Sequence, residues 1–322
     1  SGNATALTTF FTQSNQVASI SGKYYTNVFN ADSGSADRAS QFQIAYGNST
    51  GGGALAYNNT AAPGVSPAST IYGQYRTLML EDENSDFIFG NFTGSSIYVL
   101  SVERARYKES LLPGSLNLTV GKGSRTISLT DNSKDVTLPT FYGTQRAYEI
   151  VSGSDGAAYA GNGYSVSGSY GLFFPDTSTI ILNGAALDGN SGTSGLTGTN
   201  DGFGINLGTN TTANTNGQNN QKLFNALVSG SNFGLNSEET ITSDFVFVRA
   251  RNSEFNYSEN PSYISGSTGE VIYNYFINNP QTYMTTVGLY NDSNDLLAVA
   301  KLSKPLNKDF TKEALIRVKL DF

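Results

Sequence analysis

The sequence predicts a mainly β protein, with antiparallel sheets in sandwich-like modules, long loops rich in Gly, Asn, Ser and Thr, and about one short helix. Charged residues are only 14% of the 322 residues and Gly reaches 35, a composition that suits many short strands joined by turns. Towards the C-terminus, apolar and charged side chains alternate with the two-residue period of a half-buried strand. The apolar positions of this run are Ile316, Val318, Leu320 and Phe322.

The last fifty residues carry the clearest strand signals. Residues 282–310 predict a strand, a tight acidic turn and a second strand, and residues 312–322 predict a third. Chain ends usually fray unless they are held, so we expect this end to be tied into a sheet.

Strand patterns divide the rest of the chain. Residues 1–70 show few of them, which predicts an extended N-terminal arm or a loosely structured region. Residues 71–187 show many, including YRTLML, FIFGNF, SIYVLSVERA, SLNLTV and TISLT, which predict a β domain. Within it, Pro175 and Asp176 predict a turn between two apolar strands.

Residues 188–220 have almost no large apolar side chains and predict a long polar loop. Leu223, Phe224 and Leu227 then follow helical spacing, with Gly230 behind them, so a short helix is expected here. Residues 221–322 thus predict a second β region with one short helix and a C-terminal strand. We expect residues 1–70 and 188–220 to become ordered mainly through contacts with neighbouring subunits.

Composition excludes several classes of chemistry. Cys and His are absent, which removes disulfides, thiolate nucleophiles, Ser-His pairs and nearly all zinc sites. The net charge of -7 argues against a nucleic-acid partner, and no apolar stretch reaches the length of a membrane span. Residues 301–322 hold six basic and three acidic side chains, a net charge of +3, which suits either contact with an acidic neighbour or the solvated face of an edge strand.

Three acidic turns are candidates for Ca²⁺ binding, and solvated turns are the simpler explanation of each. None has the spacing of an EF-hand loop. We therefore expect no metal and no cofactor. The turns contain Glu81, Asp82, Glu83 and Asp86; Asp131 and Asp135; and Asp292 and Asp295.

Three segments resemble virion structural proteins of large contractile-tailed bacteriophages: residues 170–188, 249–263 and 285–322. Within the last, GLYNDSNDLLAVAKL is similar to a hairpin of phage tail-collar and tail-fibre attachment proteins. The resemblance implies a part of a phage particle, more in the tail or baseplate than in the head, and it assigns no catalytic residue.

Composition and resemblance together predict a non-enzymatic virion component, assembled in the host cytoplasm. It would act within a symmetric multi-subunit assembly, on other virion proteins and copies of itself. The alternatives are a capsid decoration or receptor-binding surface protein, and a glycan depolymerase that uses paired carboxylates, with Tyr stacking on sugars because Trp is absent. The candidate interface residues are Leu289, Tyr290, Leu296, Leu297, Ile316, Arg317, Val318, Lys319, Leu320 and Phe322.

Overall fold

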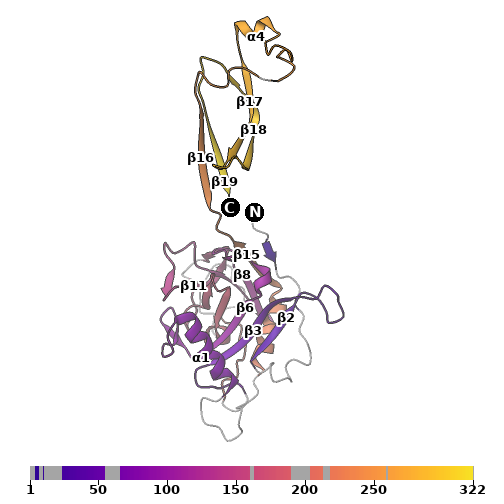
Figure 1. The fold of residues 1–322 in the computed structure, drawn as a ribbon. Helices are drawn as coiled ribbons and strands as arrows, with labels where there is room; N and C mark the ends of the chain where they lie inside the picture. The colour runs from indigo at the N-terminus through magenta and orange to yellow at the C-terminus, as the bar shows by residue number, and fades with distance from the viewer. Residues whose placement is uncertain are drawn as a thin grey trace. The chain divides into compact units, whose positions relative to one another are not determined.

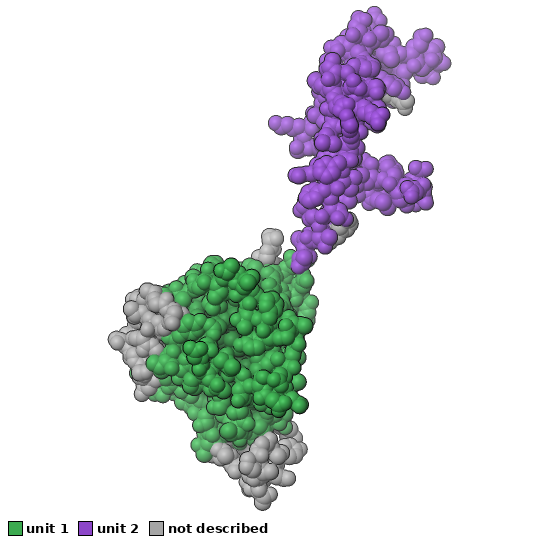
Figure 2. Space-filling view, turned by 90° about the vertical axis from the view of Figure 1, so that its left-hand side faces the viewer, with its two compact units in different colours: residues 1–239 green, residues 240–322 purple. Residues whose placement is uncertain are grey.

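The computed structural model forms two compact units, residues 1–239 (unit 1) and 240–322 (unit 2), each described here by itself (Figure 2). It describes the backbone of residues 4–6 and, in addition, residues 10, 24–54, 66–159, 163–189, 204–212, 218–258 and 260–321. The predicted mainly β, antiparallel fold is confirmed. The boundary between the units differs from the domain limits predicted above, because a strand at 232–238 belongs to the large sheet of unit 1.

Unit 1 is built on one antiparallel sheet of 13 strands (Figure 1). In pairing order its main path is β1 (Ala4–Ala6), β15 (Asn232–Glu238), β8 (Asn117–Lys122), β9 (Arg125–Asp131), β11 (Gln145–Ser154), β13 (Gly171–Phe174), β14 (Thr179–Asn183), β6 (Ser96–Val102), β3 (Ser40–Asn48) and β2 (Tyr25–Phe29). Three short strands pair beside this path: β10 (Thr140–Tyr142) and β12 (Ala157–Ala158) with β11, and β7 (Ser110–Leu111) with β15.

The described part of residues 1–70 is not the extended arm that the sequence predicts. β3 pairs with β6 from Phe42 opposite Val102 to Asn48 opposite Ser96, so it is an integral strand of the sheet. Nearly every residue of β3 is buried, and the expectation of an arm overlooked a strand pattern in which Phe42, Ile44 and Tyr46 alternate with small or polar residues. Of the expected loop at 188–220, residues 190–203 and 213–217 lie outside the described residues.

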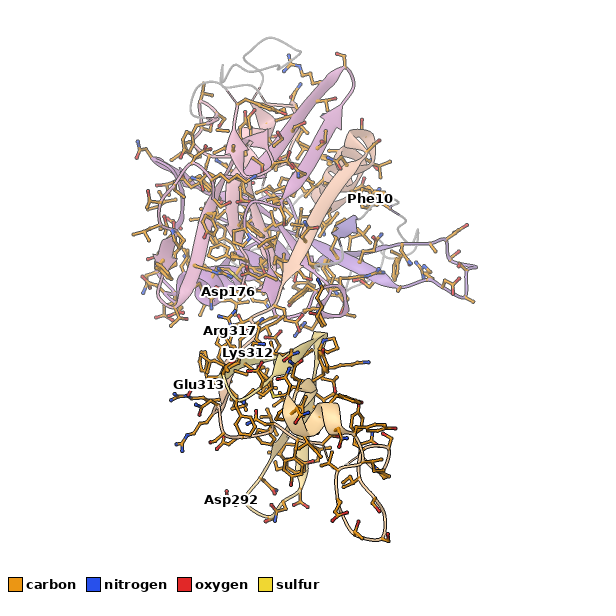
Figure 3. The ribbon with its side chains drawn as sticks, turned by 90° about the horizontal axis from the view of Figure 1, so that it is seen from above. Phe10, Asp176, Asp292, Lys312, Glu313 and Arg317 are labelled. Carbon is orange, nitrogen blue, oxygen red and sulfur yellow. The ribbon has the colours of Figure 1, made fainter. Side chains whose placement is uncertain are left out.

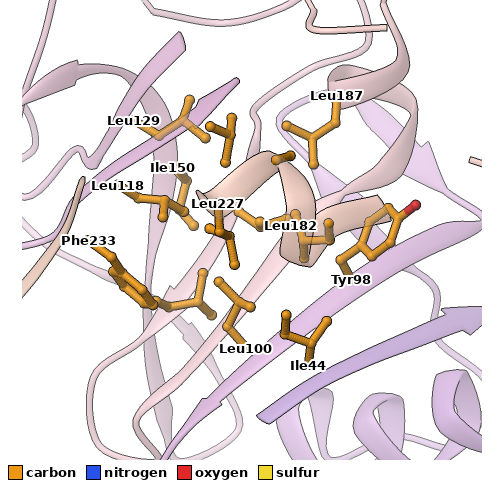
Figure 4. Close-up of a cluster of buried hydrophobic side chains, with 14 of the residues drawn as sticks. Ile44, Tyr98, Leu100, Leu118, Leu129, Ile150, Leu182, Leu187, Leu227 and Phe233 are labelled. Carbon is orange, nitrogen blue, oxygen red and sulfur yellow. The ribbon is translucent and has the colours of Figure 1, made fainter. Parts of the chain in front are cut away.

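Both faces of the central strands are covered. Along β6, Ile97 and Val99 pack in one hydrophobic cluster with helix α1 (Pro67–Leu80) and the hairpin of β4 (Phe87–Phe89) and β5 (Phe92–Gly94). Tyr98 and Leu100 point to the other cluster, which contains Leu227 of α3 (Asn219–Gly230) and Leu187 of α2 (Gly184–Asp188) (Figure 4). Alternate side chains of β6 therefore pack in two different hydrophobic cores, one on each face of the sheet.

The sheet curls around α3. Six strands separate β15 from β3 along the pairing order, yet the rings of Phe233 and Phe42 meet with centroids 5.1 Å apart. Leu223 and Leu227 of α3 are fully buried in the same cluster. A twisted antiparallel sheet of this size curves or closes, and here the helix fills the concave side.

The predicted helix at 221–230 is confirmed as α3, but the expected strand YRTLML is the end of α1. Its start, which the strand interpretation overlooked, carries a capping box of Ser66 and Ser69, with Pro67 at the first helical position. Four α-helices occur in the described parts of the chain, with α4 (Asn274–Asn278) in unit 2, and a 3-10 turn spans Arg104–Arg106.

The raised pKa of Tyr72, in α1, predicts that unit 1 loses stability at high pH. Its hydroxyl donates to the Gly94 carbonyl at 2.8 Å, and burial raises the pKa of Tyr72 to about 12. Because the folded pKa lies above the ordinary value of 10, this contribution to stability is complete below pH 10 and is lost as the pH rises through 12. We expect Tyr72→Phe to flatten the fall in the free energy of unfolding between pH 10 and 12, measured by urea denaturation; an unchanged slope would contradict this.

Unit 2 consists of two antiparallel ribbons. β16 (Ser243–Ala250) pairs with β19 (Ala314–Asp321), and β17 (Thr282–Tyr290) pairs with β18 (Leu296–Lys308). The predicted strand, acidic turn and two further strands at the C-terminus are confirmed as far as Asp321, and Phe322 lies outside the described residues. In Figure 1 both ribbons run along one long body, with α4 at one end. We call the end that carries α4 the head of unit 2. Among the described residues, no helix combines the length and apolar character that a bilayer crossing requires.

Candidate functional site in residues 240–322

Unit 2 exposes apolar side chains where unit 1 buries them. Of the 25 large hydrophobic side chains exposed in the described residues, 17 lie in unit 2, which is about a quarter of the chain. Of the 48 buried hydrophobic residues, only five lie there: Ala250, Phe276, Ala314, Ile316 and Val318. Two-stranded ribbons with so small a core are marginal on their own, so these exposed residues mark unit 2 as the candidate functional site.

The ribbon of β16 and β19 has an inner and an outer face. Ile316 and Val318 alternate with exposed residues and are buried on the inner face. On the outer face, Phe245, Phe247 and Leu315 are 48%, 62% and 68% exposed. We call these three side chains the outer apolar face.

The charged groups around the outer apolar face are already paired. Arg249 donates to the Glu313 carboxylate at 2.8 Å, and Lys319 lies 2.6 Å from Asp321. The hydrogen bond from Lys319 is the largest cause that lowers the pKa of Asp321. Arg317 lies over the ring of Phe245, with its guanidinium carbon 5.1 Å from the centroid. A partner can therefore cover this face without having to supply a charge for each cation.

The interface residues predicted from sequence differ in their exposure. Tyr290, Leu296, Leu297, Arg317 and Lys319 are exposed, whereas Leu289 and Leu320 are half-buried. Ile316 and Val318 are buried inside unit 2, and Phe322 lies outside the described residues. Phe245 and Phe247 were missed because alternation in β16 predicts a strand, but it does not reveal which face of that strand the rest of unit 2 leaves exposed.

The head of unit 2 is organised by a buried lysine. Lys308, at the end of β18, has no exposed surface, and its Nζ donates to Asn256 Oδ1 at 2.8 Å, to the Asn252 carbonyl at 3.0 Å and to the Asp309 carbonyl at 3.1 Å. The Asn256 amide also donates to the Asn252 carbonyl at 2.7 Å. This cage fixes the loop that follows β16 against the end of β18.

Phe255 lies within that fixed loop in a left-handed backbone conformation, with φ of 54°. Such a conformation is rare for a bulky residue and costs on the order of 1–3 kcal/mol, so it persists only where neighbouring contacts impose it. Here the Phe255 carbonyl accepts from the Thr282 hydroxyl, and the Arg251 amide donates to the Glu254 carboxylate at 2.9 Å. The Phe255 side chain nevertheless remains 66% exposed. Strain of this kind clusters at binding sites.

An open cavity of about 950 Å³ lies in the head, beside this loop. Five of the residues that line it are aromatic: Phe255, Tyr257, Tyr263, Phe276 and Tyr283. Phe276 is buried and packs against Tyr263, with ring centroids 5.5 Å apart, whereas Phe255, Tyr257 and Tyr283 are exposed. The polar groups between them come from Glu254, Ser258, Gln281 and Thr282.

The acidic turns organise the backbone around them. The buried Asp131 carboxylate accepts the Gly114 amide at 2.8 Å, and Asp82 accepts the Asn84 amide at 2.9 Å. Figure 3 shows Asp292 at the β17–β18 turn, apart from Lys312 and Glu313. Among the described residues, no three acidic side chains come together as a metal site would require.

Comparison with known proteins adds no relative. No protein-family model, no curated protein and no solved structure matches this chain.

Proposed function

We propose that the protein is a non-enzymatic structural component of a multi-subunit assembly, and that unit 2 is its main contact element. One observation carries this proposal: 17 large hydrophobic side chains are exposed on a unit that buries five hydrophobic residues. Exposed apolar side chains gathered on one small unit are typical of interaction sites in soluble proteins. Burial against neighbours would supply the stability that two marginal ribbons lack.

A second copy of the chain is the partner we propose for the outer apolar face. Arg249, Lys319 and Arg317 are engaged by Glu313, Asp321 and Phe245 of the same ribbon. Because a buried charge without a partner is costly, a face whose cations are already engaged within its own ribbon suits contact with its own copy better than contact with a strongly acidic surface.

The phage particle remains part of the proposal as the setting that the sequence resemblance implies, with the tail, baseplate or fibre attachment as the place in it. A surface protein that binds a receptor is the second candidate, and the aromatic cavity in the head favours it. Both candidates use unit 2 and neither requires a catalytic residue.

Sedimentation equilibrium of the full chain over a range of concentrations tests the assembly proposal. We expect a mass that is a small integer multiple of the 34.2 kDa chain and that persists at micromolar concentration. A monomer at every concentration would contradict self-association. The phage setting is tested separately, by whether the protein is detected in purified particles.

A further inference from the structure

We propose that the cavity in the head of unit 2 is a binding site for an uncharged saccharide. This inference does not depend on self-association through the outer apolar face. It comes from the lining of the cavity, from its charge and from the way its loop is held.

The lining combines ring surfaces with hydrogen-bonding groups. Phe255, Tyr257 and Tyr283 present exposed rings, and Phe276 contributes a buried one. A saccharide has apolar C–H surfaces that pack on such rings and hydroxyl edges that require donors and acceptors. The Glu254 carboxylate and the Gln281 amide supply those groups beside the rings. Small-ligand sites are usually concave and combine apolar walls with a few placed polar groups; this cavity has polar and apolar surface in nearly equal parts, and its 950 Å³ is within the normal size.

Charge narrows the ligand class. Among the described residues that line the cavity there is one carboxylate, Glu254, and no Lys or Arg. An anionic ligand such as a phosphate ester or an acidic sugar would approach this carboxylate without a compensating cation, which is unfavourable. An uncharged sugar can donate its hydroxyl protons to the same oxygen atoms.

The loop that carries two of the rings, Phe255 and Tyr257, is held in place by contacts within unit 2. Lys308 holds Asn252 and Asn256, and the Thr282 hydroxyl donates to the Phe255 carbonyl. A loop backbone that is already ordered loses little conformational freedom on binding, which favours affinity. Such a fixed, strained loop with exposed aromatic side chains is what a preformed binding site requires.

Calorimetric titration of the full chain tests the proposal with maltohexaose, cellohexaose, mannohexaose and chitohexaose. Tetramethylammonium serves as a cationic probe, because aromatic rings beside a carboxylate also suit a cation. The substitution Tyr283→Ala removes a cavity ring. Tyr290→Ala is the matched control, because Tyr290 lies on the same strand, is 62% exposed against 63% for Tyr283, and does not line the cavity.

We expect at least one neutral oligosaccharide to bind at millimolar concentration or below. Tyr283→Ala should weaken this binding by about tenfold and Tyr290→Ala by less than about twofold. Failure of all four saccharides to bind, binding that Tyr283→Ala leaves unchanged, or binding of tetramethylammonium alone would overturn the proposal. None of these outcomes depends on the oligomeric state.

Discussion

Replacing Phe245, Phe247 and Leu315 together by Ser is expected to convert the protein from an oligomer into a monomer. Each of these side chains is about half or more exposed in the single chain. Burying a fully exposed side chain of this size against a partner contributes about 1.5–3 kcal/mol, so the exposed fractions of the three supply roughly 3–5 kcal/mol per copy. A change of 1.4 kcal/mol corresponds to a tenfold change in Kd, and both copies in a contact lose these side chains. We therefore expect the Kd of the triple variant to rise by three orders of magnitude or more.

The control for this experiment is a pair of equally exposed side chains in unit 1. Leu138 and Val166 are 78% and 71% exposed, and their replacement by Ser should leave the sedimentation coefficient unchanged. Circular dichroism should show that the triple variant keeps its strands, because the outer apolar face contributes little to the fold of one chain. Equal dissociation by both sets of substitutions would rule out a specific role for β16 and β19.

Lys308→Met is expected to make the loop of residues 251–258 in the head of unit 2 open more easily. The substitution leaves the Asn256 side-chain oxygen without its lysine donor, whereas the Asn252 and Asp309 carbonyls each keep one other donor and lose only their link to Lys308. A buried acceptor that loses its partner costs about 1–3 kcal/mol, and removal of a buried cation offsets part of the sum. We expect the local opening free energy to fall by about 2–4 kcal/mol.

Hydrogen exchange of the amides in residues 251–258 measures this opening directly. We predict faster exchange by between about 30- and 1000-fold in Lys308→Met, which corresponds to the expected loss of free energy. Lys304→Met is the matched control, because Lys304 is an exposed lysine on the same strand. Similar exchange in the two variants would mean that the cage does not hold the loop.

Local patterns predicted the elements whose signals are local. The alternation in β19 and the turn between β17 and β18 lie within short stretches, and so do the spacing of Leu223 and Leu227 in α3 and the Pro175–Asp176 turn. Each of these predictions is confirmed, because an amphipathic face or a turn is encoded within a few neighbouring residues.

The features that were missed depend on contacts distant in sequence. The place of β3 inside the sheet depends on its pairing with β6, which is distant in sequence, and the curl of the sheet is visible only where Phe42 meets Phe233. Likewise, Lys308 lies more than fifty residues from Asn252 and Asn256. A basic C-terminal segment predicted an exposed lysine there, and only the folded chain shows one of its lysines buried as a structural anchor.

Hydroxyl-radical footprinting of the assembled protein tests the central claim most directly, because it measures which side chains the assembly covers. The proposal predicts that Phe245, Phe247 and Leu315 are protected in the oligomer, while Leu138 and Phe141 of unit 1, also exposed in the single chain, are oxidised. Oxidation of the three outer-face side chains at the rate of Leu138 and Phe141 would contradict the claim that unit 2 is the contact element.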